Sequence, residues 1–305
     1  TEEVVVIGTR TQGRSALDSP APVDVIGGET MSNQGDTDMS NLLRNVIPSY
    51  NVNDQPISDA ATLVRPANLR GLAPDHTLML VNGKRRHRAS VITWLGNGIS
   101  NGSQGPDAAA IPGAALKRIE VLRDGASAQY GSDAIAGVMN FVLNDSAEGG
   151  SLEVRYGEYK EGDGEQVTIA GNIGLPLGDN GFLNLTAEWG ESDPTSRSEQ
   201  RADAQTLIDN GYQDVPAPAM IWGRPIVNDD MKLWANFGMD LSDTLTLYGH
   251  ANYNSKEVDG GFFFRNPTNR GAVYSGDGGE TLLVGDLTPN DSQGCPVVAL
   301  GGADN

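Results

Sequence analysis

The chain has 305 residues, of which 38% are hydrophobic and 39 are glycine, and it carries a formal net charge of -19. The acidic balance argues against nucleic acid as the main partner, because phosphate binding needs a basic surface. No run approaches the roughly 18 consecutive apolar residues of a transmembrane helix, although membrane-spanning strands escape that test because only alternate residues face lipid.

Charge is distributed unevenly along the chain. Residues 1–150 carry 12 basic and 16 acidic side chains, whereas residues 151–305 carry 9 and 24. This difference in charge between the two parts predicts a domain boundary near residue 150. An acidic second half would attract cations or cationic complexes, although solubility alone is a sufficient explanation for it.

Residues 1–14 begin with a short β-prone run that is followed by polar residues. A run of this kind is able to pair with the edge of another protein's sheet through main-chain bonds. The alternatives are an ordinary first strand or a frayed terminus. No basic and then apolar signal peptide is present, so we expect an exported protein to be in its mature form here.

Residues 15–148 predict a compact α+β unit. Asp36 or Thr37 is expected to cap a helix, which Pro48 ends. Asn82–Gly83 is a turn dipeptide. The expected elements, in chain order, are a strand at Pro22–Ile26, the helix through Asn45, strands at Leu63–Gly71 and Thr77–Val81, and a short helical turn at Ile111–Leu116.

The most informative stretch is Lys117–Leu143, K-R-I-E-V-L-R-D-G-A-S-A-Q-Y-G-S-D-A-I-A-G-V-M-N-F-V-L. Its apolar residues predict two strands, separated by a tight turn and one turn of helix. Gly125, Gly131 and Gly137 stand where the backbone needs freedom or close approach. This run resembles the end of the plug domain of TonB-dependent outer-membrane receptors, whose signature reads I-E-R-I-E-V-L-R-G-P/D-G-x-x-A-x-Y-G-x-x-A-x-x-G-V-I-N.

Earlier motifs extend the resemblance. P-V-D-V-I, a helix, L-R-G-L and L-M-L-V-N-G-K-R precede the signature in the order that plug domains show, over nearly the whole of residues 15–148. The resemblance implies that residues 15–148 are a plug domain and that residues 1–14 hold a TonB box, the segment that pairs with TonB. The residues that look like this box are Glu3, Val4, Val5, Val6, Ile7 and Gly8.

Residues 149–305 change character, since five segments in this part alternate apolar and polar residues. A period of two puts each set on one face of a sheet. Short turns are expected at Pro176–Asn180 and Ser242–Asp243, and a long connection at Ser192–Asp229. Outer-membrane barrels place long loops at one end and short turns at the other, so this pattern indicates the start of such a barrel.

An open sheet edge cannot sit in lipid, so five strands cannot form a barrel by themselves. We therefore expect the chain to be the N-terminal part of a longer receptor. With the 22-stranded plugged barrel that the resemblance implies, roughly seventeen further strands would complete it. The expected fold is an α+β plug domain followed by an antiparallel transmembrane β-barrel in a Gram-negative outer membrane.

Lys84–Arg88 forms a basic cluster, K-R-R-H-R. Basic runs also occur in nucleic-acid-binding proteins, but one run in an acidic chain is weak evidence for that partner. In the family this segment contributes to the outward-facing apex of the plug, which implies contacts with an anionic ligand. The alternative is that the arginines pair with inward-facing Glu153, Glu188 and Asp240 of the barrel. The candidate ligand-binding residues are Arg85, Arg86, His87, Arg88, Trp94 and Asn97.

Arg70, Glu120 and Arg123 lie inside the motifs that most resemble the family. Plugs of the family use motif arginines in ion pairs with barrel glutamates, as a latch between plug and wall. The resemblance therefore implies a plug–barrel latch at these three residues. The alternative is structural pairing without a role in gating.

Enzyme motifs are absent from the sequence. Gly125–Gln129 departs from G-x-S-x-G at its last position, no G-x-x-x-x-G-K-[ST] phosphate loop occurs, and the three histidines are too scattered for a shared metal site. No cofactor is expected. Cys295 is the single cysteine, and we expect its disulfide partner beyond residue 305, with a free buried thiol as the alternative.

The resemblance implies energy-coupled uptake of a scarce nutrient across the outer membrane. The cargo is expected to be a ferric siderophore, cobalamin, a saccharide or a peptide, and the implied partners are TonB and its inner-membrane energising complex. Two alternatives remain open. One is a signalling receptor of the same fold, which carries an extra N-terminal domain. The other is a passive or structural barrel, which would not need Glu3–Gly8.

Overall fold

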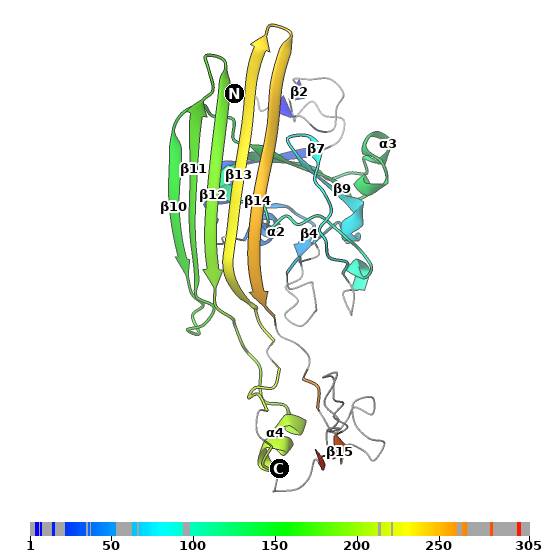
Figure 1. Cartoon of the computed structure of the whole chain (residues 1–305). Helices are drawn as coiled ribbons and strands as arrows, with labels where there is room; N and C mark the ends of the chain where they lie inside the picture. Colours follow the sequence, from blue (N-terminus) through cyan, green and yellow to red (C-terminus); the bar gives the residue numbers. More distant parts are fainter. Residues whose placement is uncertain are drawn as a thin grey trace, which may run out of the picture. The chain divides into compact units, whose positions relative to one another are not determined.

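The structure is a computed structural model that divides into two compact units, Thr1–Thr195 with Arg224–Gly260 and Ser196–Gly223 with Gly261–Asn305. The first unit contains the plug and a sheet of long strands that we call the barrel sheet (Figure 1). The described residues are 22–34, 36, 38–52, 63–65, 67–93, 98–212, 215–220, 222–260 and 264–266, with short pieces at 4–5, 7, 14–15, 281–282 and 298–299.

The plug is built on a five-stranded sheet with the order β3-β8-β9-β6-β7. β8 and β9 pair antiparallel, and β6 and β9 pair parallel. The strands are β3 (Val23–Gly27), β6 (Thr77–Val81), β7 (Lys84–Arg85), β8 (Leu116–Leu122) and β9 (Gly137–Leu143). The two strands predicted within Lys117–Leu143 are confirmed, and they lie side by side near the centre of this sheet.

Short elements connect the strands of the plug. The strand predicted at Leu63–Gly71 is shorter than expected, because Arg70 and Gly71 turn the backbone with φ of 56° and 70°. The connecting elements are β1 (Val4–Val5), β2 (Arg14–Ser15), α1 (Gly28–Ser32), β4 (Tyr50–Val52), β5 (Ala67–Leu69), α3 (Ser127–Tyr130) and the 3-10 turns Pro74–His76, Gly98–Ser100, Gly113–Ala115 and Ser132–Ala134.

Helix α2 (Met39–Val46) begins one residue after its cap, Asp38. The Asp38 Oδ1 atom accepts hydrogen bonds from Ser40 N at 2.9 Å and from Asn41 N at 3.2 Å, which satisfies donors that the first helical turn leaves open. The expectation that Asp36 is the cap is therefore wrong. Asp36 instead accepts a bond from Asp38 N at 2.9 Å and so shapes the turn before the helix.

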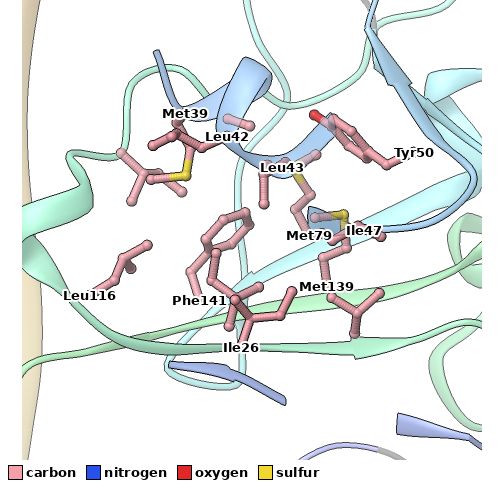
Figure 2. Close-up of a cluster of buried hydrophobic side chains, with 14 of the residues drawn as sticks. Ile26, Met39, Leu42, Leu43, Ile47, Tyr50, Met79, Leu116, Met139 and Phe141 are labelled. Atoms are coloured by element: carbon pink, nitrogen blue, oxygen red, sulfur yellow. The ribbon is translucent and has the colours of Figure 1, made fainter. Parts of the chain in front are cut away.

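The main core of the plug lies between α2 and one face of the sheet (Figure 2). Leu43 from the helix and Phe141 from β9 are both 0% exposed. Alternate residues of a strand point to opposite faces, so Met79, Met139 and Phe141 share this face while their neighbours line the other. The burial of large apolar side chains is the main favourable term in holding α2 on the sheet.

The barrel sheet has five antiparallel strands in sequential order. The prediction of five alternating strands is confirmed, and the long strands of Figure 1 run side by side in chain order. The short connections are also in the predicted places, between residues 176 and 181 and between 242 and 245. The strands are β10 (Gly150–Gly157), β11 (Gln166–Pro176), β12 (Gly181–Ser192), β13 (Ile226–Ser242) and β14 (Leu245–Asp259).

The two faces of the barrel sheet differ in chemistry. Leu152 and Val154 on one face are 79% and 65% exposed. The other face carries Asn184, Thr186 and Trp234, which are all buried. Because Trp234 and its neighbours contact the plug, the polar face of the sheet is turned toward the plug and the apolar face is turned away from it.

The second unit contains helix α4 (Ala202–Asp209) and the short strands β15 (Thr281–Leu282) and β16 (Val298–Ala299). Arg201 precedes α4 and binds Asp203 through two hydrogen bonds of 2.9 Å. Cys295 lies outside the described residues. In the part of the chain that is described, none of the helices combines the length and the apolar character needed to cross a membrane.

Candidate functional site

The plug contacts the barrel sheet through a turn that the sequence singles out, Asn82–Gly83. Both residues have positive φ, 48° and 75°, which asparagine and glycine adopt most readily. Asn82 Nδ2 donates to Asn236 Oδ1 of β13 at 3.0 Å, and Asn236 Nδ2 donates to the carbonyl oxygen of Asn144 at 2.8 Å. Leu143 N donates to Asn82 Oδ1 at 2.9 Å, so one turn fastens β6, the end of β9 and the barrel wall.

A second contact centres on Trp234 of β13, which is 4% exposed. Its Nε1 donates to the carbonyl oxygen of Ala110 in the plug at 3.1 Å. The Arg86 guanidinium lies 5.2 Å from the centroid of the Trp234 ring, and its Nη1 donates to Asn252 Oδ1 at 2.8 Å. Burial lowers the pKa of Arg86, and the carboxylate of Asp107 partly opposes that shift. Arg86 therefore reaches the wall through an amide and an aromatic ring.

A buried charge pair lies further along the wall. Lys232 Nζ donates to Glu188 Oε1 at 2.6 Å, and both side chains are only 7% exposed. On the plug, Asp38 lies near enough to Lys232 to be influenced by its charge. Asp38 also forms an ion pair with Arg65. Burial alone would raise the pKa of Asp38, but the positive charges of Arg65 and Lys232 outweigh it and hold that pKa well below its usual range. Asp38 is therefore ionised at neutral pH, between helix α2 and the barrel sheet.

The wall and the plug fit closely in this region. Arg155 of β10 donates through Nη1 to the carbonyl oxygens of Gln34 and Asp36, and it also pairs with Glu153. A cavity of about 20 Å³ lies between the two parts, large enough for one water molecule. Its lining comes from the plug residues Met31, Leu42, Gly113 and Ala114 and from the barrel residues Glu153, Arg155, Thr168, Ala170 and Glu188.

The predicted ligand-binding residues that the structure describes do not form one group. Arg85 Nη1 binds Asp133 Oδ2 at 2.5 Å, and Arg88 Nη2 lies 4.0 Å from Asp133 Oδ1, so these two arginines fasten the signature turn of the plug. Burial and then the charge of Arg86 lower the pKa of His87. Trp94 and Asn97 lie outside the described residues. A ligand-binding role for the six residues stays a prediction.

The expected alternative, in which these arginines pair with three wall carboxylates, is wrong for the described residues. The wall carboxylates have nearer partners on the wall itself: Glu153 binds Arg155 and Glu188 binds Lys232. The third, Asp240, accepts a hydrogen bond of 2.6 Å from Thr246 Oγ1. Opposite charges at neighbouring positions on the inward face of the sheet therefore pair with each other rather than with the arginines of the plug.

The three residues of the predicted latch find partners inside the plug. Arg70 Nη1 lies 3.9 Å from Asp124 Oδ1, and Arg123 Nη2 donates to Asp24 Oδ1 at 3.0 Å. Glu120 is 0% exposed and accepts bonds from Arg118 Nε at 2.9 Å and Asn140 Nδ2 at 3.1 Å. These contacts lie within the plug, and a role of Arg70, Glu120 and Arg123 toward the barrel stays a prediction.

The TonB-box-like segment is described only in part. Val4–Val5 pairs antiparallel with Arg14–Ser15, and Glu3, Val6 and Gly8 lie outside the described residues. Ile7 is 1% exposed and packs on the face of the plug sheet opposite α2. The apolar cluster around it contains Leu78, Leu80, Leu122, Ala126, Ala134 and Val138.

Comparison with known proteins identifies the family. Residues 15–138 match the family model described as the TonB-dependent Receptor Plug Domain. The Ferrienterobactin receptor of Escherichia coli (strain K12) is 26% identical over 280 residues, which cover 88% of this chain and 33% of that receptor. Residues 15–138 belong to the TonB-dependent receptor family as its plug domain. The family consists of outer-membrane receptors of Gram-negative bacteria and not of enzymes, which agrees with the predicted family and location.

Other relatives of this TonB-dependent receptor agree. The Ferric enterobactin receptor PirA of Pseudomonas aeruginosa is 32% identical over 141 residues, which cover 45% of the chain and 18% of that protein. A crystal structure of a mutant of the P. aeruginosa ferric enterobactin receptor PfeA in complex with enterobactin has a TM-score of 0.57 and 22% identity, over 77% of this chain and 33% of that one, which supports the fold. The chain thus spans about a third of the length of such relatives.

Proposed function

We propose that this receptor imports a scarce nutrient into the periplasm with energy transmitted by TonB. The observation that carries the proposal is a plug that is hydrogen-bonded to the polar face of a barrel sheet at several points and packed closely against it where Arg155 and Glu188 face helix α2. In a complete barrel, a plug held in this way would block diffusion. Passage of cargo then requires the plug to rearrange, and an outer membrane has no nucleotide supply of its own to drive that change.

The N-terminal segment supplies the point at which energy would enter. Val4–Val5 has β structure and pairs with only one short strand. An extended segment of this kind presents main-chain donors and acceptors to a partner strand. TonB would pair with residues 3–8, and ligand binding would favour the state in which these residues are released.

The class of cargo that the relatives favour is a ferric siderophore. The names of several matched receptors refer to ferric enterobactin or to siderophores, and these receptors share roughly a quarter of the aligned residues with this chain. Cobalamin, saccharide and peptide cargoes are the alternatives that the same architecture allows. We therefore propose a ferric siderophore as the cargo of this receptor.

The test is an uptake assay with the receptor at its natural length in cells that lack other siderophore receptors. Uptake of iron-55 supplied as a panel of siderophores is compared with that of radiolabelled cobalamin. We expect iron uptake with at least one siderophore and its loss in a strain without TonB. Uptake of none of the siderophores would overturn the proposed cargo, whereas uptake that persists without TonB would favour the passive barrel.

A point variant sharpens the assay. Proline at residue 5 lacks the main-chain N–H that strand addition uses, so Val5→Pro is expected to abolish uptake while siderophore binding to whole cells persists. Thr11→Pro, in the polar part of the same segment, is the matched control and is expected to keep uptake. Full uptake by Val5→Pro would contradict strand pairing at this segment.

A further inference from the structure

The long connection between β12 and β13 has a well-defined base. Thr195 N donates to the carbonyl oxygen of Arg224 at 3.3 Å, and Arg224 N donates to Thr195 Oγ1 at 2.8 Å. Gly164 of the neighbouring β10–β11 connection donates to the carbonyl oxygen of Pro194 at 3.3 Å. A Cβ atom at Gly164 would lie 2.6 Å from Thr195 Cγ2, so these two connections pack against each other without spare room.

The side chain of Arg224 extends from this base to the plug. Its guanidinium lies 5.6 Å from the centroid of the Tyr159 ring, an arrangement in which the ring restricts the cation. The Arg224 Nη2 atom is 3.6 Å from Asp36 Oδ2. The two side chains are 22% and 20% exposed, so water screens their attraction less than it screens a surface pair.

On the plug, Asp36 is tied to the first turn of helix α2. Its Oδ2 atom accepts a hydrogen bond of 2.9 Å from Asn41 Nδ2, and Asn41 is only 1% exposed. Its Oδ1 atom accepts from Asp38 N, and Asp38 is the helix cap. A displacement of Asp36 therefore acts directly on the N-terminal end of α2, which covers the main core.

We propose that Arg224 and Asp36 form a latch that holds the plug against the barrel at the base of the β12–β13 connection. The latch joins a cation at the base of the connection to an anion of the plug, and Arg224 lies two residues before the start of β13. Breaking it leaves two mostly buried charges without their partner, which is costly. A change in the base of the connection is thereby transmitted to α2.

The test measures how easily the plug opens. The receptor at its natural length is placed in a planar lipid bilayer, and ion conductance through single molecules is recorded as urea is raised. We expect Arg224→Gln and Asp36→Asn each to lower the urea midpoint of channel opening by roughly 0.5–1 M. The double variant is expected to open no earlier than the more sensitive single variant, because both substitutions remove the same interaction.

Two further variants make the result decisive. Arg224→Lys keeps the charge and is expected to retain most of the wild-type midpoint. Lys117→Gln removes an exposed ion pair within the plug, where Lys117 Nζ lies 2.8 Å from Asp145 Oδ1, and is expected to leave the midpoint unchanged. Unchanged midpoints in both single variants, or effects that add fully in the double variant, would overturn the latch.

The conductance assay needs neither TonB nor a cargo. It rests on the proposed function only in that the plug must rearrange during transport. A receptor that fails to import any siderophore but shows the coupled shifts would overturn the cargo and keep the latch. A receptor that imports iron but shows no coupled shift would keep the proposed cargo and overturn the latch.

Discussion

The core of the plug and the plug–barrel interface hold their parts together by different means. In the core, apolar side chains such as Leu43 and Phe141 are fully buried (Figure 2). At the interface, hydrogen bonds such as those of Asn82 with Asn236, Asn236 with Asn144, and Trp234 with Ala110 join the plug to the barrel sheet. Water can replace bonds of the second kind at modest cost but cannot replace apolar packing.

This difference explains how the plug can remain folded and still move relative to the barrel sheet. Apolar burial contributes most of the free energy of folding, whereas the net contribution of one hydrogen bond is about 1 kcal/mol. An interface made of exchangeable bonds can open in steps.

The largest effect is expected in the apolar core. Phe141→Ala leaves a cavity between α2 and the sheet and should lower the free energy of unfolding of the plug by about 3–5 kcal/mol. The loss of free energy is measured by unfolding the receptor in urea, with cleavage of the unfolded plug by a protease as the readout. Ile92→Ala, at a side chain that is 58% exposed, is the control and should cost less than about 0.5 kcal/mol. Equal losses in the two variants would contradict the assigned core.

A buried polar residue of the plug sheet is expected to rank second. Asn140 is 0% exposed, donates to Glu120 Oε2 at 3.1 Å and accepts from Gly83 N at 2.9 Å. Asn140→Ala removes both hydrogen bonds in a fully buried site and should cost about 1–3 kcal/mol in the same unfolding experiment. A loss below that of the interface variant described next would argue that water enters the sheet at this point.

An interface residue should have a smaller effect. Asn82→Gly removes the bonds to Asn236 and Leu143 but keeps the positive φ of 48° without strain. We expect a loss of about 0.5–1.5 kcal/mol, together with faster hydrogen exchange at the Leu143 amide. Unchanged exchange at Leu143 would show that Asn82 does not protect this amide in solution.

The smallest effect is a dependence on pH at Asp38. The pKa of this carboxyl is lowered in the folded plug, so its stabilising contribution is complete above the ordinary aspartate pKa of about 3.9 and is lost as pH falls through the folded pKa. Asp38→Asn retains a good helix cap and removes the charge. Its stability deficit should be equal at pH 7 and pH 5 and should shrink at pH 3. A deficit that changes between pH 7 and pH 5 would point to another group.

Most of the fold follows from local sequence patterns. The alternation of apolar and polar residues after residue 150 predicts the five strands of the barrel sheet. The dipeptide Asn82–Gly83 predicts the turn between β6 and β7 of the plug. The contacts of Arg224 and Asp36 could not be predicted in this way, since they join residues 188 positions apart and neither lies in a motif. Arg70 and Arg123 do lie in motifs, yet their partners Asp124 and Asp24 are brought near by the tertiary fold of the plug, in the case of Asp24 by the pairing of β3 with β8.

Among the described residues, β3 is an edge strand of the plug sheet. It meets β8 in five residue pairs, from Val23 with Leu122 to Gly27 with Arg118, whereas β8, β9 and β6 each have neighbours on both sides. A pulling force on the N-terminus would therefore reach this edge strand before the inner strands. Its detachment would leave β8, β9 and β6 paired as a template, so the same strand could pair again without the slow search of an unfolded chain.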